Sequence, residues 1–167
     1  MQPFQCKGRE AVKALAVGLL GGTINLLAIH LVQLRWPHPG TGGLAHVVWK
    51  TLSFVLFFLG FRHSPLPPPS ETVKTLFHIV VGMIMAWIYA VFFYSRLTGP
   101  PWLRGLIFVQ IPFLIQVFVI LPQIGAGVLG LKLGLATPFL VFILNAIYGL
   151  ILGAFYVPCS ADTKISR

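Results

Sequence analysis

Apolar residues run through this chain in long blocks, and short stretches rich in proline, glycine and charge separate them. Four of the blocks are close to the roughly 20 residues that an α-helix needs to cross the hydrocarbon core of a bilayer. They predict spanning helices at 11–34, 72–95, 102–121 and 137–157. The chain is therefore expected to be an all-α, polytopic transmembrane helix bundle, with residues 1–167 in a single domain.

A further apolar block at 44–61 is harder to assign. It is only just long enough to span, and it carries His46 and Lys50 in its first half. A lysine at mid-membrane costs about 2.5–3.5 kcal/mol on insertion scales. We therefore interpret the block as a short re-entrant or interfacial helix beside four spanning helices, and five spanning helices are the alternative.

Lysine and arginine in short loops orient such a protein, because the cytoplasmic side carries their excess. With four spans, the side of the two termini would hold Lys7, Arg9, Lys13, Arg96, Arg104, Lys164 and Arg167. The other side would hold Arg35, Lys50, Arg62, Lys74 and Lys132. The larger set predicts cytoplasmic termini. A fifth span would leave the split nearly even, with Lys50 inside the membrane.

The composition agrees with a membrane protein and leaves no room for a separate soluble domain. Apolar residues are 57% and charged residues 9% of the chain, whereas ordinary globular domains have about 25% charged residues. The net charge of +9 is spread singly or in pairs over the ends of segments, so nucleic acid is not an expected partner. Membrane lipids and other integral membrane proteins are the expected partners. Cys6 and Cys159 lie near the termini, in a reducing compartment, where a structural disulfide is not expected.

The most specific local pattern is a small residue at every fourth position in two of the predicted helices. The first stripe contains Ala14, Gly18 and Gly22, with Asn25 beside it, and the second contains Asn145, Gly149 and Gly153. Such stripes let helix backbones approach closely in lipid, and a buried asparagine adds a hydrogen bond. We expect the first helix to pack against the last helix of its own bundle through these residues. Docking of another subunit is the alternative, and leucine at Gly18 or Gly149 should disrupt either interface.

The histidines are the candidate ligands for a cofactor. In the four-span arrangement His30, His46 and His78 share one leaflet, where neutral imidazoles could bind a haem iron or a transition metal. Five spans would separate His30 from His78. Interfacial histidines that bond to backbone or head groups are the simpler interpretation, so no cofactor or metal is expected by default.

Transport and catalysis find less support in the chain. Every acidic residue lies near the end of a segment or in a tail, namely Glu10, Glu71 and Asp162. The polar residues within the apolar blocks are Asn25, Gln110, Gln116 and Asn145. They could line a path for a neutral solute, but hydrogen bonds between helices are the favoured use. No nucleophile and base stand in a recognisable pattern, so we predict no catalytic residue and no enzyme.

A set of landmarks between residues 76 and 156 resembles a known group of proteins. They are His78, Tyr89 eleven residues later, the turn at 100–105, the helix end at 122–125 and the pair Tyr148 and Gly149. In this order the chain is similar to the small four-helix, YagU-like bacterial inner-membrane proteins, which are largely without an assigned biochemical function. Asn145 stands where the resemblance leads us to expect a histidine. The resemblance implies four helices and a bacterial inner membrane, and it implies no activity.

These observations together predict a non-catalytic integral membrane protein. Its expected role is that of an accessory or structural subunit that packs against a larger membrane complex or lipid. A haem- or metal-binding membrane subunit that uses His30, His46 and His78 is one alternative. A small-solute permease or channel is another.

Overall fold

A computed structural model describes residues 3–35, 70–156 and 158 of the chain. Its main helices are α1 (Pro3–Arg35), α3 (Glu71–Ile88), α4 (Pro101–Ile115) and α6 (Thr137–Phe155). These described ranges contain no strand. Four helices are long and apolar enough to cross a membrane, so the predicted all-α transmembrane bundle is confirmed.

Two of the spans are extended by wide π turns. The turn η1 (Tyr89–Phe93) continues α3, while η2 (Gln116–Ile120) and the short α5 (Leu121–Gln123) continue α4. A proline inside a helix is expected to loosen it at that point. Proline has no N–H to donate to the preceding turn, yet Pro112 stays inside α4 and the widening begins four residues later, at Gln116.

Local chemistry explains where the helices begin. The Ser70 side chain accepts a hydrogen bond from the Val73 N–H at 3.3 Å and caps α3, and Glu71 pairs with Lys74 at 2.7 Å in its first turn. Pro101 occupies the first position of α4, where the missing N–H costs nothing. Between α5 and α6 the chain turns through the 3-10 turn η3 (Val128–Gly130), which ends on a glycine with a φ of 72°.

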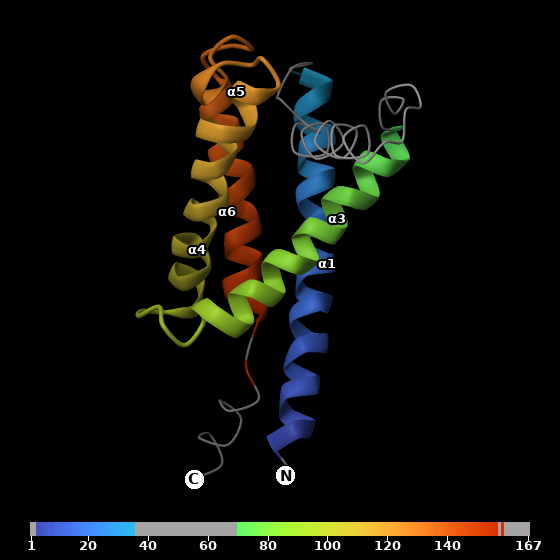
Figure 1. Cartoon of the computed structure of the whole chain (residues 1–167), viewed down its shortest axis with the longest axis vertical. Helices are drawn as coiled ribbons and strands as arrows, with labels where there is room; N and C mark the ends of the chain where they lie inside the picture. The colour runs from blue at the N-terminus through green and yellow to red at the C-terminus, as the bar shows by residue number, and fades with distance from the viewer. Residues whose placement is uncertain (1–2, 36–69, 157, 159–167) are drawn as a thin grey trace, which may run out of the picture.

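The helices form two antiparallel pairs (Figure 1). The helix α3 crosses α1 obliquely, and α4 lies alongside α6. The helix α1 begins and α6 ends at one end of the molecule, which we call the terminal end, whereas α1 ends and α3 begins at the opposite end. This is the arrangement of the four-span prediction, since a fifth crossing would place the end of α1 and the start of α3 at opposite ends. The block 44–61 itself, with His46 and Lys50, lies outside the described residues.

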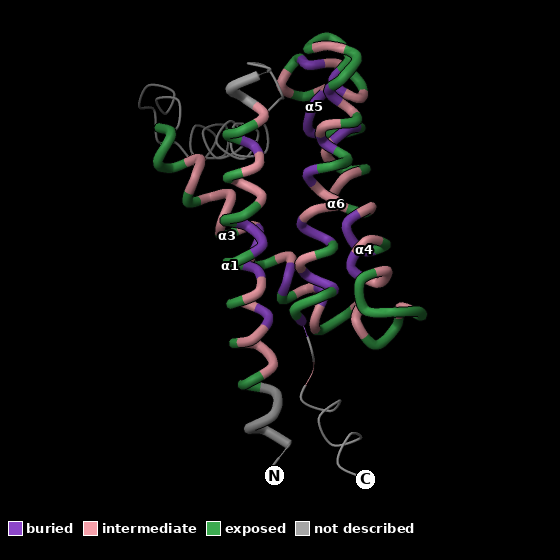
Figure 2. Tube along the Cα trace, turned by 180° about the vertical axis from the view of Figure 1, so that it is seen from behind, coloured by how far each residue is buried: buried purple, intermediate pink, exposed green. Residues whose placement is uncertain are grey.

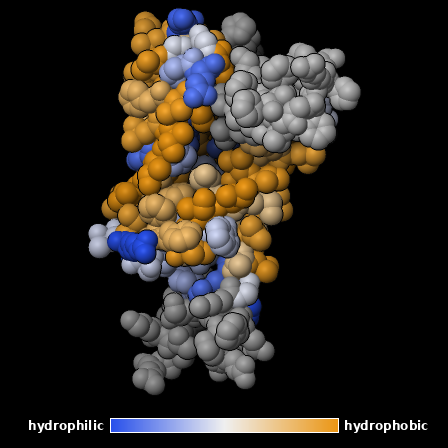
Figure 3. Space-filling model, viewed as in Figure 1, coloured by the Kyte–Doolittle hydropathy of each residue, from blue (hydrophilic) through white to orange (hydrophobic). Residues whose placement is uncertain are grey.

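Buried residues line the faces where the helices meet, and exposed residues cover the outside (Figure 2). The main core contains Ala14, Ala86, Tyr89, Phe108, Val109, Tyr148, Leu152 and Tyr156. A smaller core beside the turn between α5 and α6 contains Val117, Leu121, Ala126 and Val141. The outer surface is nonetheless strongly apolar (Figure 3). Long apolar side chains therefore face outward, as a surface in contact with lipid requires.

Candidate functional site

The first small-residue stripe lies against α3. A Cβ atom on Gly18 would come within 2.7 Å of the Met83 Cα and 2.9 Å of the Gly82 carbonyl oxygen. One turn further along, a Cβ on Gly22 would lie 3.6 Å from the Ile79 Cα, which is an ordinary contact. Backbone meets backbone where α1 and α3 cross, and the glycines permit this approach.

The second stripe lies against α4. A Cβ atom on Gly149 would come within 2.8 Å of the Gly105 carbonyl oxygen, and one on Gly153 would lie 2.8 Å from the Trp102 Cα. Gly105 is the matching residue on α4, because a Cβ there would collide with the backbone carbonyl of Gly149. The α4/α6 pair is thus held together by glycines on both helices.

The predicted pairing of the two stripes therefore needs correction. Gly18 faces Gly82 of α3, and Gly149 faces Gly105 of α4. The two stripes therefore pack against other helices and not against each other. Gly82 and Gly105 offer close backbone approach without belonging to a glycine stripe of their own, and the sequence pattern passed over them. The helices α1 and α6 do meet, but through Gly21, where a Cβ would lie 3.0 Å from the Tyr148 ring.

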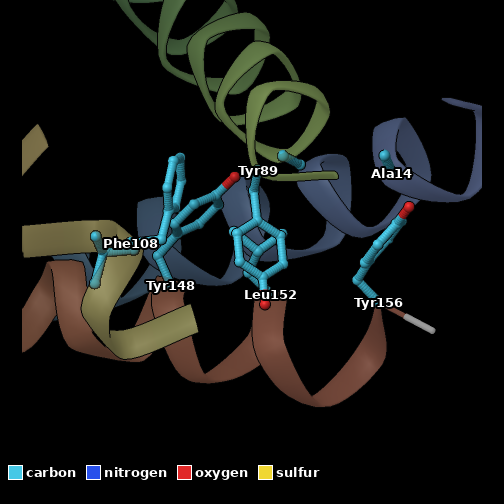
Figure 4. Close-up of a cluster of buried hydrophobic side chains, with 8 residues drawn as sticks. Ala14, Tyr89, Phe108, Tyr148, Leu152 and Tyr156 are labelled. Atoms are coloured by element: carbon cyan, nitrogen blue, oxygen red, sulfur yellow. The ribbon is translucent and has the colours of Figure 1, made fainter. Parts of the chain in front are cut away.

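Tyr148 joins the two helix pairs. Its hydroxyl, carried by α6, donates a hydrogen bond to the Gly82 carbonyl of α3 at 2.5 Å. The side chain projects from α6 into the core, beside Phe108 and Tyr89 (Figure 4). In the sequence Tyr148 stands out only as a landmark of a resemblance, because the hydrogen-bond partner of a phenol depends on which backbone reaches it.

The amide side chains within the spans are largely used inside the chain. Asn145 donates to the Val141 carbonyl at 2.8 Å and to the Gln116 side-chain oxygen at 3.3 Å, which links α6 to η2. Gln110 donates to the Leu106 carbonyl at 3.0 Å within α4. The side-chain oxygen of Asn25 is buried and has no hydrogen-bond partner among the described residues.

The candidate histidine ligands are only partly placed. His30 is exposed on α1, and its Nδ1 donates to the Leu26 carbonyl at 2.8 Å. This is a bond to the backbone, as expected for a histidine that binds no cofactor. His78 is half-buried on α3, and His46 lies outside the described residues. Within the ranges that the structure describes, no three His, Cys, Asp or Glu side chains gather as a metal site would require. The haem or metal site stays an untested alternative to the expectation that no cofactor binds.

A cluster of tyrosines lies where η1 meets α4 and α6. The rings of Tyr89, Tyr94 and Tyr156 contact one another edge to face, with centroids 5.2–6.0 Å apart. Phe108 of α4 lies 5.2 Å from the Tyr89 ring. Tyr89 is fully buried, and its hydroxyl has no hydrogen-bond partner among the described residues.

Arg104, in the first turn of α4, covers one side of this cluster. Its guanidinium lies 5.1 Å from the centroid of the Tyr94 ring, a cation–π contact. The Nε atom donates to the Gly99 carbonyl at 2.8 Å, and the Nη1 atom donates to the Tyr94 carbonyl at 3.2 Å. These contacts hold the guanidinium against the turn that joins η1 to α4.

Comparisons with known proteins add no further evidence, because no family model, curated protein or solved structure matches the chain. The similarity to YagU-like proteins stays a prediction. The class that the fold itself defines is a small multi-pass membrane protein, whose described residues contain four apolar helices long enough to span.

Proposed function

We propose that this chain is a non-catalytic membrane subunit that packs against a larger membrane complex. The proposal rests on one observation: the inside of the bundle is occupied by contacts between its own helices, whereas the outside presents free apolar side chains. Inside, the glycines and several polar groups serve contacts between the chain's own helices, as Gly149 with Gly105 and Tyr148 with Gly82 illustrate. Such groups act as structural elements of the bundle and are not free to line a solute path.

The outside offers long apolar side chains on more than one helix. Leu27 on α1 and Phe139 on α6 are 61% and 71% exposed. Since lipid tails are as apolar as these side chains, a partner helix would be held by dispersion contacts and shape, as is usual between membrane helices. The described residues lie largely in four apolar spans, so this outer surface is the main means by which the bundle acts on other molecules.

The first test is extraction from native membranes in a mild detergent, followed by size-exclusion chromatography and mass spectrometry of the peak that contains the chain. The proposal expects stoichiometric co-elution with a larger membrane complex. Elution as a monomer or small homo-oligomer would overturn it and favour a self-contained permease or binder.

Site-specific cross-linking then separates a true partner from a contaminant. In a background with Cys6→Ser and Cys159→Ser, the variants Leu27→Cys and Phe139→Cys place a cross-linker on two outward faces. Leu152→Cys, at a side chain only 1% exposed, is the matched control. We expect at least one outward position to give a discrete hetero-adduct that Leu152→Cys does not give. Equal labelling of the same protein from all three positions would contradict a specific interface.

A further inference from the structure

The held guanidinium of Arg104 has unused hydrogen-bonding capacity. Nε and Nη1 donate to the Gly99 and Tyr94 carbonyls, while Nη2 has no acceptor among the described residues. Arginine presents its donors in a rigid planar fork that suits carboxylate and phosphate oxygens. Because two of its nitrogens are already fixed to the backbone, the third is held in place at little further cost in side-chain entropy.

The positive charge of Arg104 also lacks a counterion in the described part of the chain. Glu10 and Glu71 are the described carboxylates, and the ion pair found there joins Glu71 to Lys74 at the start of α3. Arg104 is half-buried, and a partly desolvated charge without a partner is unfavourable. An anion from outside the bundle would relieve this cost.

The position of Arg104 is that of a membrane interface. It lies in the first turn of the span Pro101–Gln123, at the terminal end of the molecule. Hydrophilic side chains gather at the loop between η1 and α4, directly beside the apolar surface (Figure 3). Trp102, 49% exposed, lies in the same first turn of α4, where an interfacial anchor is expected. Lipid phosphates occupy this level of a bilayer.

The π turn shapes the surroundings of the guanidinium. In η1 the Tyr94 N–H bonds to the Tyr89 carbonyl at 2.8 Å, five residues back, which brings Tyr94 beside Tyr89. The Tyr94 ring then lies under the guanidinium and its carbonyl accepts the Nη1 donor. Such π turns in helices are frequent at functional sites, and here the turn supplies both the ring and the acceptor that hold Arg104.

From these contacts we propose that Arg104, supported by Tyr94, binds the phosphate of an anionic phospholipid in the leaflet at the terminal end. The ligand chemistry is a phosphodiester anion that accepts hydrogen bonds from Nη2. A lipid is favoured over free phosphate because Ile107, one turn further along α4 and 43% exposed, offers an apolar surface near the arginine on which an acyl chain can lie. The site does not depend on the subunit role proposed above.

The test is native mass spectrometry of the purified full chain, titrated with dioleoylphosphatidylglycerol and, separately, with dioleoylphosphatidylcholine. Wild type should retain one phosphatidylglycerol in preference to phosphatidylcholine. Arg104→Gln should weaken that binding about tenfold, the usual effect of losing a hydrogen bond to a charged group. Arg96→Gln removes the same charge from an exposed residue in the loop that precedes α4, and this control should bind the lipid as wild type does.

Several outcomes would overturn the proposal. Equal losses of lipid binding in Arg104→Gln and Arg96→Gln, or no preference for phosphatidylglycerol in wild type, would show that the lipid is attracted only by the general positive charge of the surface. Displacement of the lipid by millimolar inorganic phosphate would assign the site to free phosphate. If Arg104→Gln does not purify as a folded protein, Arg104→Lys replaces it. Lysine is a point charge without the fork, so we expect about threefold weaker binding, and unchanged binding would overturn the oriented site.

Discussion

Two buried tyrosine hydroxyls in the same core have opposite relations to their surroundings. The Tyr148 hydroxyl donates to the Gly82 carbonyl, whereas the Tyr89 hydroxyl has no partner among the described residues. A hydrogen bond between membrane helices contributes on the order of 1 kcal/mol, and a buried polar group that lacks one has a desolvation cost that nothing offsets. Substitution by phenylalanine removes only the oxygen atom in each case.

We therefore predict opposite responses to this substitution. Tyr148→Phe should destabilise the bundle by about 1 kcal/mol, and Tyr89→Phe should be neutral or slightly stabilising. The measurement is the thermal denaturation midpoint of the purified protein in detergent, followed by circular dichroism. Equal shifts in the two variants would mean that the Tyr148 hydrogen bond contributes no more than an unpaired hydroxyl.

Sequence reasoning reached some of these residues and not others. The amides within the spans were expected to bond between helices, and Asn145 does bond to Gln116, whereas Gln110 bonds to the Leu106 carbonyl of its own helix. Sequence reasoning could not find the bond from Tyr148, because a backbone acceptor such as the Gly82 carbonyl carries no side-chain signal. Which carbonyl a phenol meets is decided by how the helices cross, and the chain's pattern does not contain that information.

At the scale of helices, the glycines of the two interfaces differ in how much room they leave. A Cβ on Gly105 would strike the Gly149 backbone, which has no flexible end that could move aside. A Cβ on Gly22 would make only ordinary contact with Ile79. Both glycines lie within helices, so alanine changes the helix propensity equally at the two positions. The difference in stability between the two variants therefore reports the packing effect alone.

Gly105→Ala is predicted to cost about 1–3 kcal/mol, the range for overpacked interiors, through separation of α4 from α6. Gly22→Ala should cause no loss, because alanine has the higher helix propensity and the contact is comfortable. Monodispersity after a graded heating series, read by size-exclusion chromatography, measures both. A Gly105→Ala protein as heat-resistant as Gly22→Ala would show that the α4/α6 contact is looser than described.

The helices themselves could be predicted from the sequence, since long apolar blocks bounded by proline and glycine have few other structures available in a membrane. Most of their ends lie within two residues of the prediction, but α1 begins at Pro3, eight residues before Ala11. The partner of each helix could not be predicted. A single glycine such as Gly82 or Gly105 is enough to make a close interface, and it stands out only when the facing backbone is known.

For the whole molecule, we propose that the terminal end lies in the cytoplasm. That end carries Arg9 and Lys13 on the first part of α1 together with Arg96 and Arg104 near the start of α4. Positive residues in short segments favour the cytoplasmic side. The arrangement of the helices thus agrees with the charge distribution that the sequence predicted for four spans.

Cysteine accessibility in intact cells tests this orientation. In the background without Cys6 and Cys159, Ser95→Cys lies at the terminal end and Leu135→Cys, at a position 81% exposed, lies in the opposite turn. A membrane-impermeant maleimide should label Leu135→Cys from outside and should reach Ser95→Cys only after lysis. The reverse labelling pattern would show that the protein has the opposite orientation in the membrane.

The division into two helix pairs has a consequence for how the chain can be built. The α1/α3 pair and the α4/α6 pair each contain their own glycine interface, and Tyr148 supplies a side-chain bridge between them. The cut between Thr98 and Gly99, both exposed, would separate the polypeptide into two such halves. Co-expressed as fragments 1–98 and 99–167, the halves should recombine in the membrane and co-purify through a tag on either one. Covalent continuity would then be dispensable, and the protein would behave as two interlocking hairpins.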